Sequence, residues 1–394
     1  MTGNEGVTAA AGFRAAGIVA GLKKSGKADL ALVVNDGPRF EAAGVFTRNK
    51  VKAAPVLWSQ QVLTTGALRA VVLNAGGANA CTGPEGFQTA HATAEKAAEV
   101  LGCGAVEVAI CSTGLIGEQL PRDTVLAGVA KAAGELAGTP EAGTAVAGAI
   151  MTTDTVPKQA AETDPAGWTV GGTTKGAGMI APSMATMLTV ITTDAVLHQR
   201  DLDAALRTAV HYSFDRLDVD GSMSTNDTVL LLSSGASGVA ADPDVFTGAL
   251  TRACQDLARQ MQADAEGVSK RISVRVTGAA TEDDAVTVAR TIARDALVKT
   301  AMFGCDPNWG RVAAAAGYAD AEVDPDRLDV TINGVLLCKG AVVAGDRAAC
   351  DLSGKDVLIE VSLGLTGGAE ANTAEIRTTD LSHAYVEENS AYSS

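Results

Sequence analysis

Residues 175–192 read Lys-Gly-Ala-Gly-Met-Ile-Ala-Pro-Ser-Met-Ala-Thr-Met-Leu-Thr-Val-Ile-Thr, a glycine-rich loop followed by an apolar, β-branched run. Gly176 and Gly178 permit backbone conformations that other residues avoid, and Pro182 stiffens the approach to the run. A short apolar run bounded by turn residues is typical of a buried strand. The stretch therefore predicts a constrained loop that enters a strand at 187–192.

Further strands and helices are predicted on both sides of this stretch. β-Branched runs predict strands at 30–34, 70–73, 106–110, 228–232, 272–276, 328–332 and 357–363. Several alternate apolar with polar residues, which favours half-buried, mostly antiparallel sheets. Helical periodicity predicts helices at 85–101, 201–212, 243–265 and 279–295, whereas 134–146 and 162–173 are predicted loops rich in Gly, Thr and Pro. The layout predicts an α+β fold with helices covering sheet layers.

Composition excludes several classes of partner. The 394 residues carry a net charge of −15, which disfavours nucleic acid and anionic membranes because phosphates need a basic face. Aromatic residues make up 4% of the chain while glycines number 43, so the core is expected to consist of Ala, Val, Leu and Ile. The longest uncharged window, 176–193, contains Pro182 and many hydroxyls, and it predicts no membrane span.

The seven cysteines are scattered and contain no CxxC pair, so neither a disulfide framework nor a zinc site is indicated. The four histidines are isolated from one another, and no metal is expected. The N-terminus lacks a basic segment followed by an apolar run, which predicts a cytoplasmic protein.

Familiar phosphate and hydrolase motifs are not supported. Gly176–Ala181 matches G-x-G-x-x-A by letter, but a polar loop precedes it and Pro182 follows it, so it lacks the strand and helix that hold a pyrophosphate. The chain contains neither a P-loop nor a G-x-S-x-G elbow. The polar stretch Asp220–Asp227 is compatible either with a plain turn or with the lining of a polar site.

A threonine nucleophile is the remaining covalent chemistry. A Thr hydroxyl is activated when its own α-amine is freed by internal cleavage. Ala185-Thr186 offers an unhindered carbonyl beside a hydroxyl, at the mouth of the predicted strand. By composition alone, a plain loop entering a strand is the favoured interpretation of this stretch.

Several further blocks change that balance. They are Val45-Phe-Thr-Arg-Asn, Asn74-Ala-Gly-Gly-Ala-Asn-Ala-Cys-Thr-Gly, Ser112-Thr-Gly-Leu-Ile-Gly, Met151-Thr-Thr-Asp-Thr, Asp306-Pro-Asn-Trp-Gly-Arg and the tail Leu381–Ser394. Together with 175–188, in this order and over nearly the whole chain, they resemble the ornithine acetyltransferase family, the bifunctional glutamate N-acetyltransferases of arginine biosynthesis. One departure is Ser183, where many members of that family carry Asn.

The resemblance implies a layered α/β/β/α, self-processing N-terminal-threonine nucleophile enzyme with a smaller C-terminal α/β domain. It implies cleavage between Ala185 and Thr186 into an α chain, 1–185, and a β chain, 186–394, whose tail returns to the active site. The two chains are expected to stay together as α2β2 or a higher assembly.

The activity implied is transfer of the acetyl group of N2-acetylornithine to glutamate through an acetyl-threonine ester, with ping-pong kinetics. No cofactor is implied, although some relatives also use acetyl-CoA as donor. Thr186 is then the nucleophile, and Thr113 and Gly114 form the oxyanion hole. The residues implied to bind substrate, in addition to Thr186, are Thr152, Lys175, Glu266, Asn389 and Ser394.

The residue types alone favour plainer roles for several of these positions. Thr113 and Gly114 suit an ordinary turn after a strand, Lys175 a solvated loop charge and Glu266 an acid at a helix end. Two other functions compete with the transferase. One is a self-processing threonine amidase or aminopeptidase, in which water replaces glutamate as the acceptor. The other is an uncleaved, non-catalytic small-molecule binder, against which the intact Ala185-Thr186 pair argues.

Overall fold

The computed structural model describes residues 6–181, 187–365 and 372–391, and these form two compact units. The larger unit comprises Met1–Asp215 and Ser222–Met261, and the smaller comprises Arg216–Gly221 and Gln262–Ser394. The expected smaller C-terminal α/β domain is therefore present. The predicted division at residues 185 and 186 concerns a cut in the chain, which compact units do not test, and it stays a prediction.

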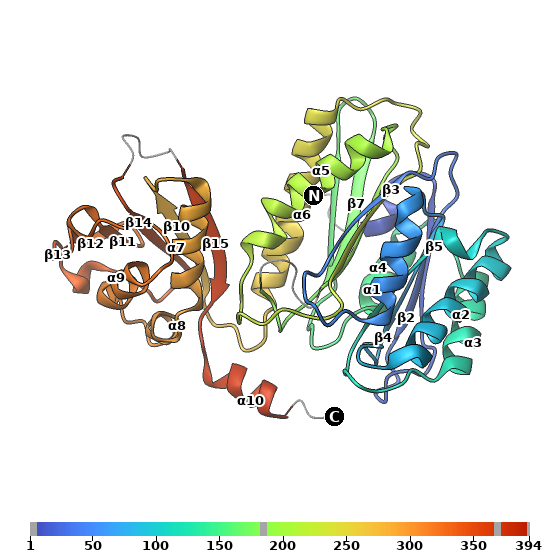
Figure 1. Ribbon diagram of the computed structural model, residues 1–394, viewed down its shortest axis with the longest axis horizontal. Helices are drawn as coiled ribbons and strands as arrows, with labels where there is room; N and C mark the ends of the chain where they lie inside the picture. Colours follow the sequence, from blue (N-terminus) through green and yellow to red (C-terminus); the bar gives the residue numbers. More distant parts are fainter. Residues whose placement is uncertain (1–5, 182–186, 366–371, 392–394) are drawn as a thin grey trace. The chain divides into compact units, whose positions relative to one another are not determined.

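Two stacked sheets form the centre of the larger unit (Figure 1). The first has the strand order β1-β2-β4-β5, with β1 Phe13–Ile18, β2 Leu30–Asn35, β4 Ala70–Ala75 and β5 Val108–Thr113. The second has the order β3-β9-β8-β7-β6, with β3 Ala42–Phe46, β9 Thr228–Ser233, β8 Leu188–Thr193, β7 Thr169–Lys175 and β6 Lys158–Thr163.

Helices cover the outer faces of both sheets. α2 (Gly83–Leu101) and α3 (Arg122–Gly134) pack on the first sheet, whereas α5 (Gln199–His211) and α6 (Pro243–Ala263) lie on the far side of the second (Figure 1). α1 (Ala54–Val62) packs beside β5, and α4 (Pro140–Ala149) packs beside β1. This order of layers confirms the expected α/β/β/α arrangement.

A single apolar cluster joins the two sheets. It contains Leu32 and Val72 of the first sheet together with Val190 and Leu230 of the second, all at most 1% exposed. Burial of a side chain of this size contributes ~1.5–3 kcal/mol to stability. The core is thus built from aliphatic residues, as the composition predicts.

The smaller unit has a six-stranded sheet of order β13-β12-β11-β14-β10-β15. Its strands are β10 Arg271–Thr277, β11 Asp329–Ile332, β12 Val335–Lys339, β13 Val342–Val343, β14 Asp356–Ser362 and β15 Ala374–Thr379. Its helices are α7 Glu282–Arg294, α8 Ala296–Phe303, α9 Trp309–Gly317 and α10 His383–Ala391. Ile272, Val274 and Val276 are buried while their neighbours are half-exposed, as the alternating pattern predicts.

All eight predicted strands and all four predicted helices are present, and nine of the twelve described strand pairings are antiparallel. Two predicted loops are wrong: 134–146 contains the start of α4, and 162–173 contains most of β7. In β7, Gly171 is needed because a Cβ there would lie 2.1 Å from the Gly6 carbonyl oxygen.

None of the helices in the described ranges combines the length and apolar character needed to span a bilayer.

Candidate active site

The end of β5 is a sharply constrained turn. β4 and β5 run parallel and pair Ala75 with Thr113, and Gly114 follows with φ +133°. A Cβ at Gly114 would lie 2.5 Å from the Gly77 backbone nitrogen, so only glycine fits. The sequence block Ser-Thr-Gly therefore marks a place where two backbone segments almost touch.

Two hydrogen-bond donors remain available at this turn. The Thr113 carbonyl accepts the N–H groups of Gly76 and Gly77, both at 3.0 Å. In the described part of the chain, neither the Thr113 hydroxyl nor the Gly114 N–H has a hydrogen-bond partner. Thr113 is only 2% exposed. Adjacent, preorganised donors of this kind are what an oxyanion hole requires.

Asn226 connects this turn to the second sheet. Its Nδ2 donates to the carbonyl oxygens of Ala78, at 2.6 Å, and Ser112, at 2.8 Å. The Ser112 hydroxyl in turn donates to Asn74 Oδ1 at 2.5 Å. Asn226 is buried and immediately precedes Asp227 and β9. This end of the Asp220–Asp227 stretch lines a polar region and is more than a turn.

Asp227 is fully buried beside the start of β8. Its Oδ1 accepts the Met187 N–H at 3.1 Å, and its Oδ2 is buried with no hydrogen-bond partner among the described residues. Burial raises the pKa of Asp227 well above its usual value, although the Met187 amide and the Lys175 charge oppose the shift.

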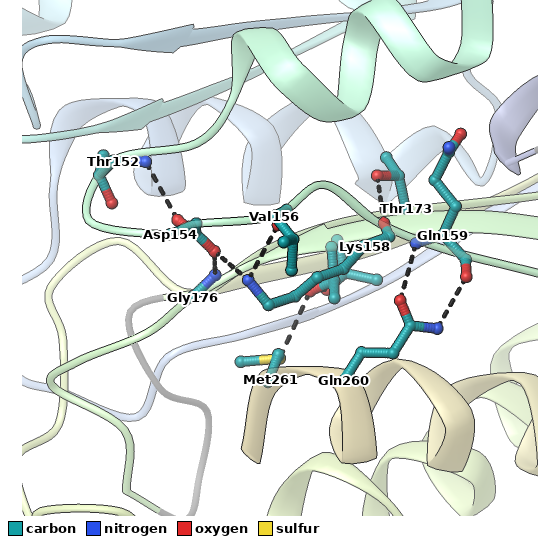
Figure 2. A network of polar contacts seen from close by, with 11 residues as sticks. Thr152, Asp154, Val156, Lys158, Gln159, Thr173, Gly176, Gln260 and Met261 are labelled. Atoms are coloured by element: carbon teal, nitrogen blue, oxygen red, sulfur yellow. Dashed lines mark hydrogen bonds and ion pairs between the residues drawn. The ribbon is translucent and has the colours of Figure 1, made fainter. Parts of the chain in front are cut away.

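Asp154, between α4 and β6, organises a second buried network (Figure 2). Its Oδ1 accepts from Lys158 Nζ at 2.6 Å and from the Gly176 N–H at 2.7 Å. Its Oδ2 accepts the Thr152 N–H at 3.0 Å. Burial alone would raise the pKa of Asp154, but the charges of Lys175 and Lys158 outweigh it and lower the pKa to about 2. Asp154 is therefore ionised.

Lys175 is the last residue of β7 and pairs with Leu188, the first residue of β8. It is 1% exposed, so the interpretation of Lys175 as a solvated loop charge is wrong. Its charge acts on both Asp154 and Asp227. A buried ammonium group at this position can pair with an anion, provided that its desolvation is compensated.

Within the smaller unit, α10 is attached to the turn after α6. Asn389 Nδ2 donates to Glu266 Oε2 at 2.8 Å, and the Ser382 hydroxyl donates to the Gly267 carbonyl oxygen at 2.6 Å. Tyr385 lies close to Gly267, where a Cβ would be 2.2 Å from the Tyr385 nitrogen. Burial, Asp220 and Glu266 raise the pKa of Tyr385 to about 12. Two of the predicted substrate-binding residues, Glu266 and Asn389, therefore contact one another.

The predicted site residues fall into three groups. Thr113, Gly114, Thr152 and Lys175 lie in the larger unit, and Glu266 and Asn389 lie in the smaller. Ala185, Thr186 and Ser394 lie outside the described residues. Sequence reasoning missed the buried polar residues that support the first group, namely Asn74, Asp154, Lys158, Asn226 and Asp227. Four of them had a signal, since Asn74 and Asp154 belong to blocks quoted for the resemblance and Asn226 and Asp227 end the polar loop.

Two stacked sheets covered by helices place the chain in the α/β/β/α sandwich class, and hydrogen-bond donors at a strand end beside buried carboxyls are features of an enzyme active site. The ArgJ family model matches residues 14–394. The chain is 63% identical to the arginine biosynthesis bifunctional protein ArgJ of Mycolicibacterium paratuberculosis, over 99% of this chain and 97% of the relative. It is 61% identical to the protein of the same name from Streptomyces coelicolor, over 98% of this chain and 100% of the relative.

The chain therefore belongs to the ArgJ family, and it is an acyltransferase of arginine biosynthesis. The resemblance to the ornithine acetyltransferase family is confirmed. Among solved structures, a similar chain is ornithine acetyltransferase of Mycobacterium tuberculosis, described as complexed with ornithine. It is 64% identical, with 46% of this chain and 97% of that chain covered and a TM-score of 0.46.

Proposed function

We propose that this chain cuts itself before Thr186 and then transfers the acetyl group of N2-acetylornithine to glutamate. In the first step the Thr186 hydroxyl attacks the Ala185 carbonyl carbon, the peptide C–N bond breaks, and an ester forms. Water opens the ester and releases the Ala185 carboxylate. The α-amine of Thr186 then has a reference pKa of ~7.7–8.0, near enough to neutrality to take the proton of its own hydroxyl.

Transfer proceeds in two half-reactions. The Thr186 hydroxyl attacks the acetyl carbonyl of N2-acetylornithine, and ornithine leaves with the proton that the α-amine has taken. The amino group of glutamate then attacks the acetyl ester, which yields N-acetylglutamate and restores the hydroxyl. Both tetrahedral intermediates carry an oxyanion, which the Thr113 hydroxyl and the Gly114 N–H stabilise.

The observation that carries this proposal is the pair of unpartnered donors at the end of β5, in a chain of the ArgJ family. Because neither donor is engaged within the described residues, both can donate to an acceptor that a ligand supplies. The developing oxyanion is such an acceptor.

Charged residues provide recognition of the substrates. Both substrates carry carboxylates, which the buried ammonium group of Lys175 can bind. Thr152 lies on the loop that contains Asp154, and its N–H donates to the Asp154 carboxylate. In the smaller unit, Glu266 suits the ammonium group of ornithine, with Asn389 and Ser394 of the tail beside it in the proposed complex. The ornithine named for the similar solved structure supports this substrate class.

The relatives are named bifunctional, which supports a second activity, and we propose that this activity is acetyl transfer from acetyl-CoA to glutamate. No resident cofactor is needed for either reaction, because the nucleophile and its base both belong to Thr186. We propose a cytoplasmic assembly of two or more αβ units, each formed by the fragments 1–185 and 186–394.

Steady-state kinetics test the transfer. With N2-acetylornithine and glutamate varied together, the account predicts parallel double-reciprocal lines, the pattern of a ping-pong reaction. Omission of glutamate should leave ornithine release limited to one turnover per site. Continuous release of ornithine and acetate without glutamate would instead identify a hydrolase.

A further inference from the structure

The connection between β7 and β8 is held at both ends by a buried carboxyl. β7 ends at Lys175 and its register partner Leu188 begins β8, so residues 176–187 join two antiparallel neighbours. The first N–H of this connection, that of Gly176, donates to Asp154 Oδ1 at 2.7 Å. The last, that of Met187, donates to Asp227 Oδ1 at 3.1 Å.

The two carboxyls reach the connection from different parts of the larger unit. Asp154 follows α4 and precedes β6, whereas Asp227 immediately precedes β9, whose first residue pairs with Leu188. Asp154 is further fixed by Lys158 Nζ, and the peptide after Asp227 is fixed by the β8–β9 ladder. Each anchor is therefore also held by a contact outside the connection.

We propose that Asp154 and Asp227 are positioning residues that clamp Gly176 and Met187, the two ends of the 176–187 connection, and that this clamp accelerates self-cleavage before Thr186. The inference rests on the proposed function, because it presumes that this bond is cut. Neither residue is assigned a proton or a bond to the substrate. Their effect is to fix the backbone at the two ends of the connection. An intramolecular reaction gains much of its rate from the alignment of the nucleophile with the carbonyl that it attacks.

The two anchors differ in the interaction that each provides. Asp154 is surrounded by Lys158 and Lys175, so its hydrogen bond to Gly176 is charge-assisted. The Asp227 side chain is fully buried, and of its two oxygens only Oδ1 accepts a hydrogen bond from the described residues. An uncharged side chain with a carbonyl oxygen is therefore expected to replace Asp227 but not Asp154.

Asp194 provides a matched control at the opposite end of β8. It is buried, and its two oxygens accept the N–H groups of Thr169, at 2.7 Å, and Ala11, at 2.9 Å. Substitution of Asp194 thus removes the same kind of contact from the same sheet, away from the 176–187 connection.

The experiment follows the appearance of the two fragments after synthesis of the full chain, by mass spectrometry against time. Asp154→Ala and Asp227→Ala should slow cleavage about ten- to a hundredfold, whereas Asp194→Ala should cleave within about twofold of the unsubstituted chain. Asp227→Asn should recover most of the rate because its amide oxygen accepts the Met187 N–H. Asp154→Asn should stay slow.

Cleavage of Asp154→Ala and Asp227→Ala at the rate of Asp194→Ala would overturn the clamp while leaving the proposed function intact. An unsubstituted chain that is never cut would overturn both. For variants that do not fold, the uncut Thr186→Ala chain provides a second measurement. Its Gly176 and Met187 amides should exchange hydrogen at least about tenfold more slowly than exposed loop amides, and exchange at the exposed rate would overturn the clamp.

Discussion

At the residue scale, the proposed chemistry depends on the Thr113-Gly114 turn at the end of β5. Thr113 is a buried residue whose hydroxyl has no hydrogen-bond partner in the described chain, and Gly114 has no room for a Cβ. Both features are understandable if a reaction intermediate supplies an acceptor for the Thr113 hydroxyl and the Gly114 N–H.

Thr113→Ala tests this directly. Removal of one oxyanion donor typically lowers kcat by ~10²–10³-fold, so acetyl transfer should fall by about that factor while the melting temperature changes little. Thr113→Ser retains the hydroxyl and should recover most of the turnover. Equal kcat in Thr113→Ala and the unsubstituted enzyme would remove Thr113 from the oxyanion hole.

Gly114→Ala should be more damaging than Thr113→Ala, because the added Cβ would lie 2.5 Å from the Gly77 nitrogen. The end of β5 must then move, which displaces the Gly114 N–H as well. We expect loss of transfer together with a lower melting temperature, measured on the same preparations. An active, fully stable Gly114→Ala enzyme would contradict the geometry described here.

Asp154 also makes stability depend on pH. Its pKa is lowered from 3.8 to about 2, so its stabilising contribution is fully present above pH about 4 and is lost as the pH falls toward 2. In the uncut Thr186→Ala background, Asp154→Asn should cost about 2 kcal/mol at pH 7. Urea unfolding should show this difference shrinking between pH 4 and pH 2. A difference that stays constant over that range would show that Asp154 is not the titrating group.

At the element scale, α10 connects the end of the chain to the turn after α6. Asn389 contacts Glu266, and the start of α10 packs on Gly267. Deletion of residues 389–394 should therefore lower acetyl transfer sharply by removing a polar partner of Glu266, while cleavage before Thr186 continues. The measurement is kcat/KM for N2-acetylornithine on the cut protein. Unchanged turnover would refute a role for the tail.

Elements with strong periodicity could be predicted from the sequence, and others could not. α2 and α6 have clear apolar stripes, and β10 alternates strictly between apolar and polar residues, so the positions of these three elements could be predicted. β7 was missed because Gly171 and Gly172 resemble a loop, although a close backbone approach requires glycine at Gly171. That approach comes from the N-terminal segment around Gly6, and local sequence contains no sign of it.

At the scale of the whole molecule, the candidate site is assembled from segments far apart in the chain. The described part of the larger unit brings the end of β5, the loop before β6 and the loop before β9 around the ends of β7 and β8. Resemblance to a family pointed to Thr113 and Lys175 in this unit, whereas the supporting Asp154, Asn226 and Asp227 emerge only from the tertiary contacts. Burial of a polar residue depends on the complete fold, and that is why residue type alone misplaced Lys175 in solvent.

The central claim is that Thr186 becomes an N-terminal nucleophile that holds the acetyl group. The most direct test is intact-mass spectrometry of the purified protein after incubation with N2-acetylornithine and no glutamate. The account predicts fragments of 185 and 209 residues, the second beginning Thr-Met-Leu-Thr and heavier by one acetyl group, which glutamate then removes. A single 394-residue chain that still transfers acetyl groups would contradict the account.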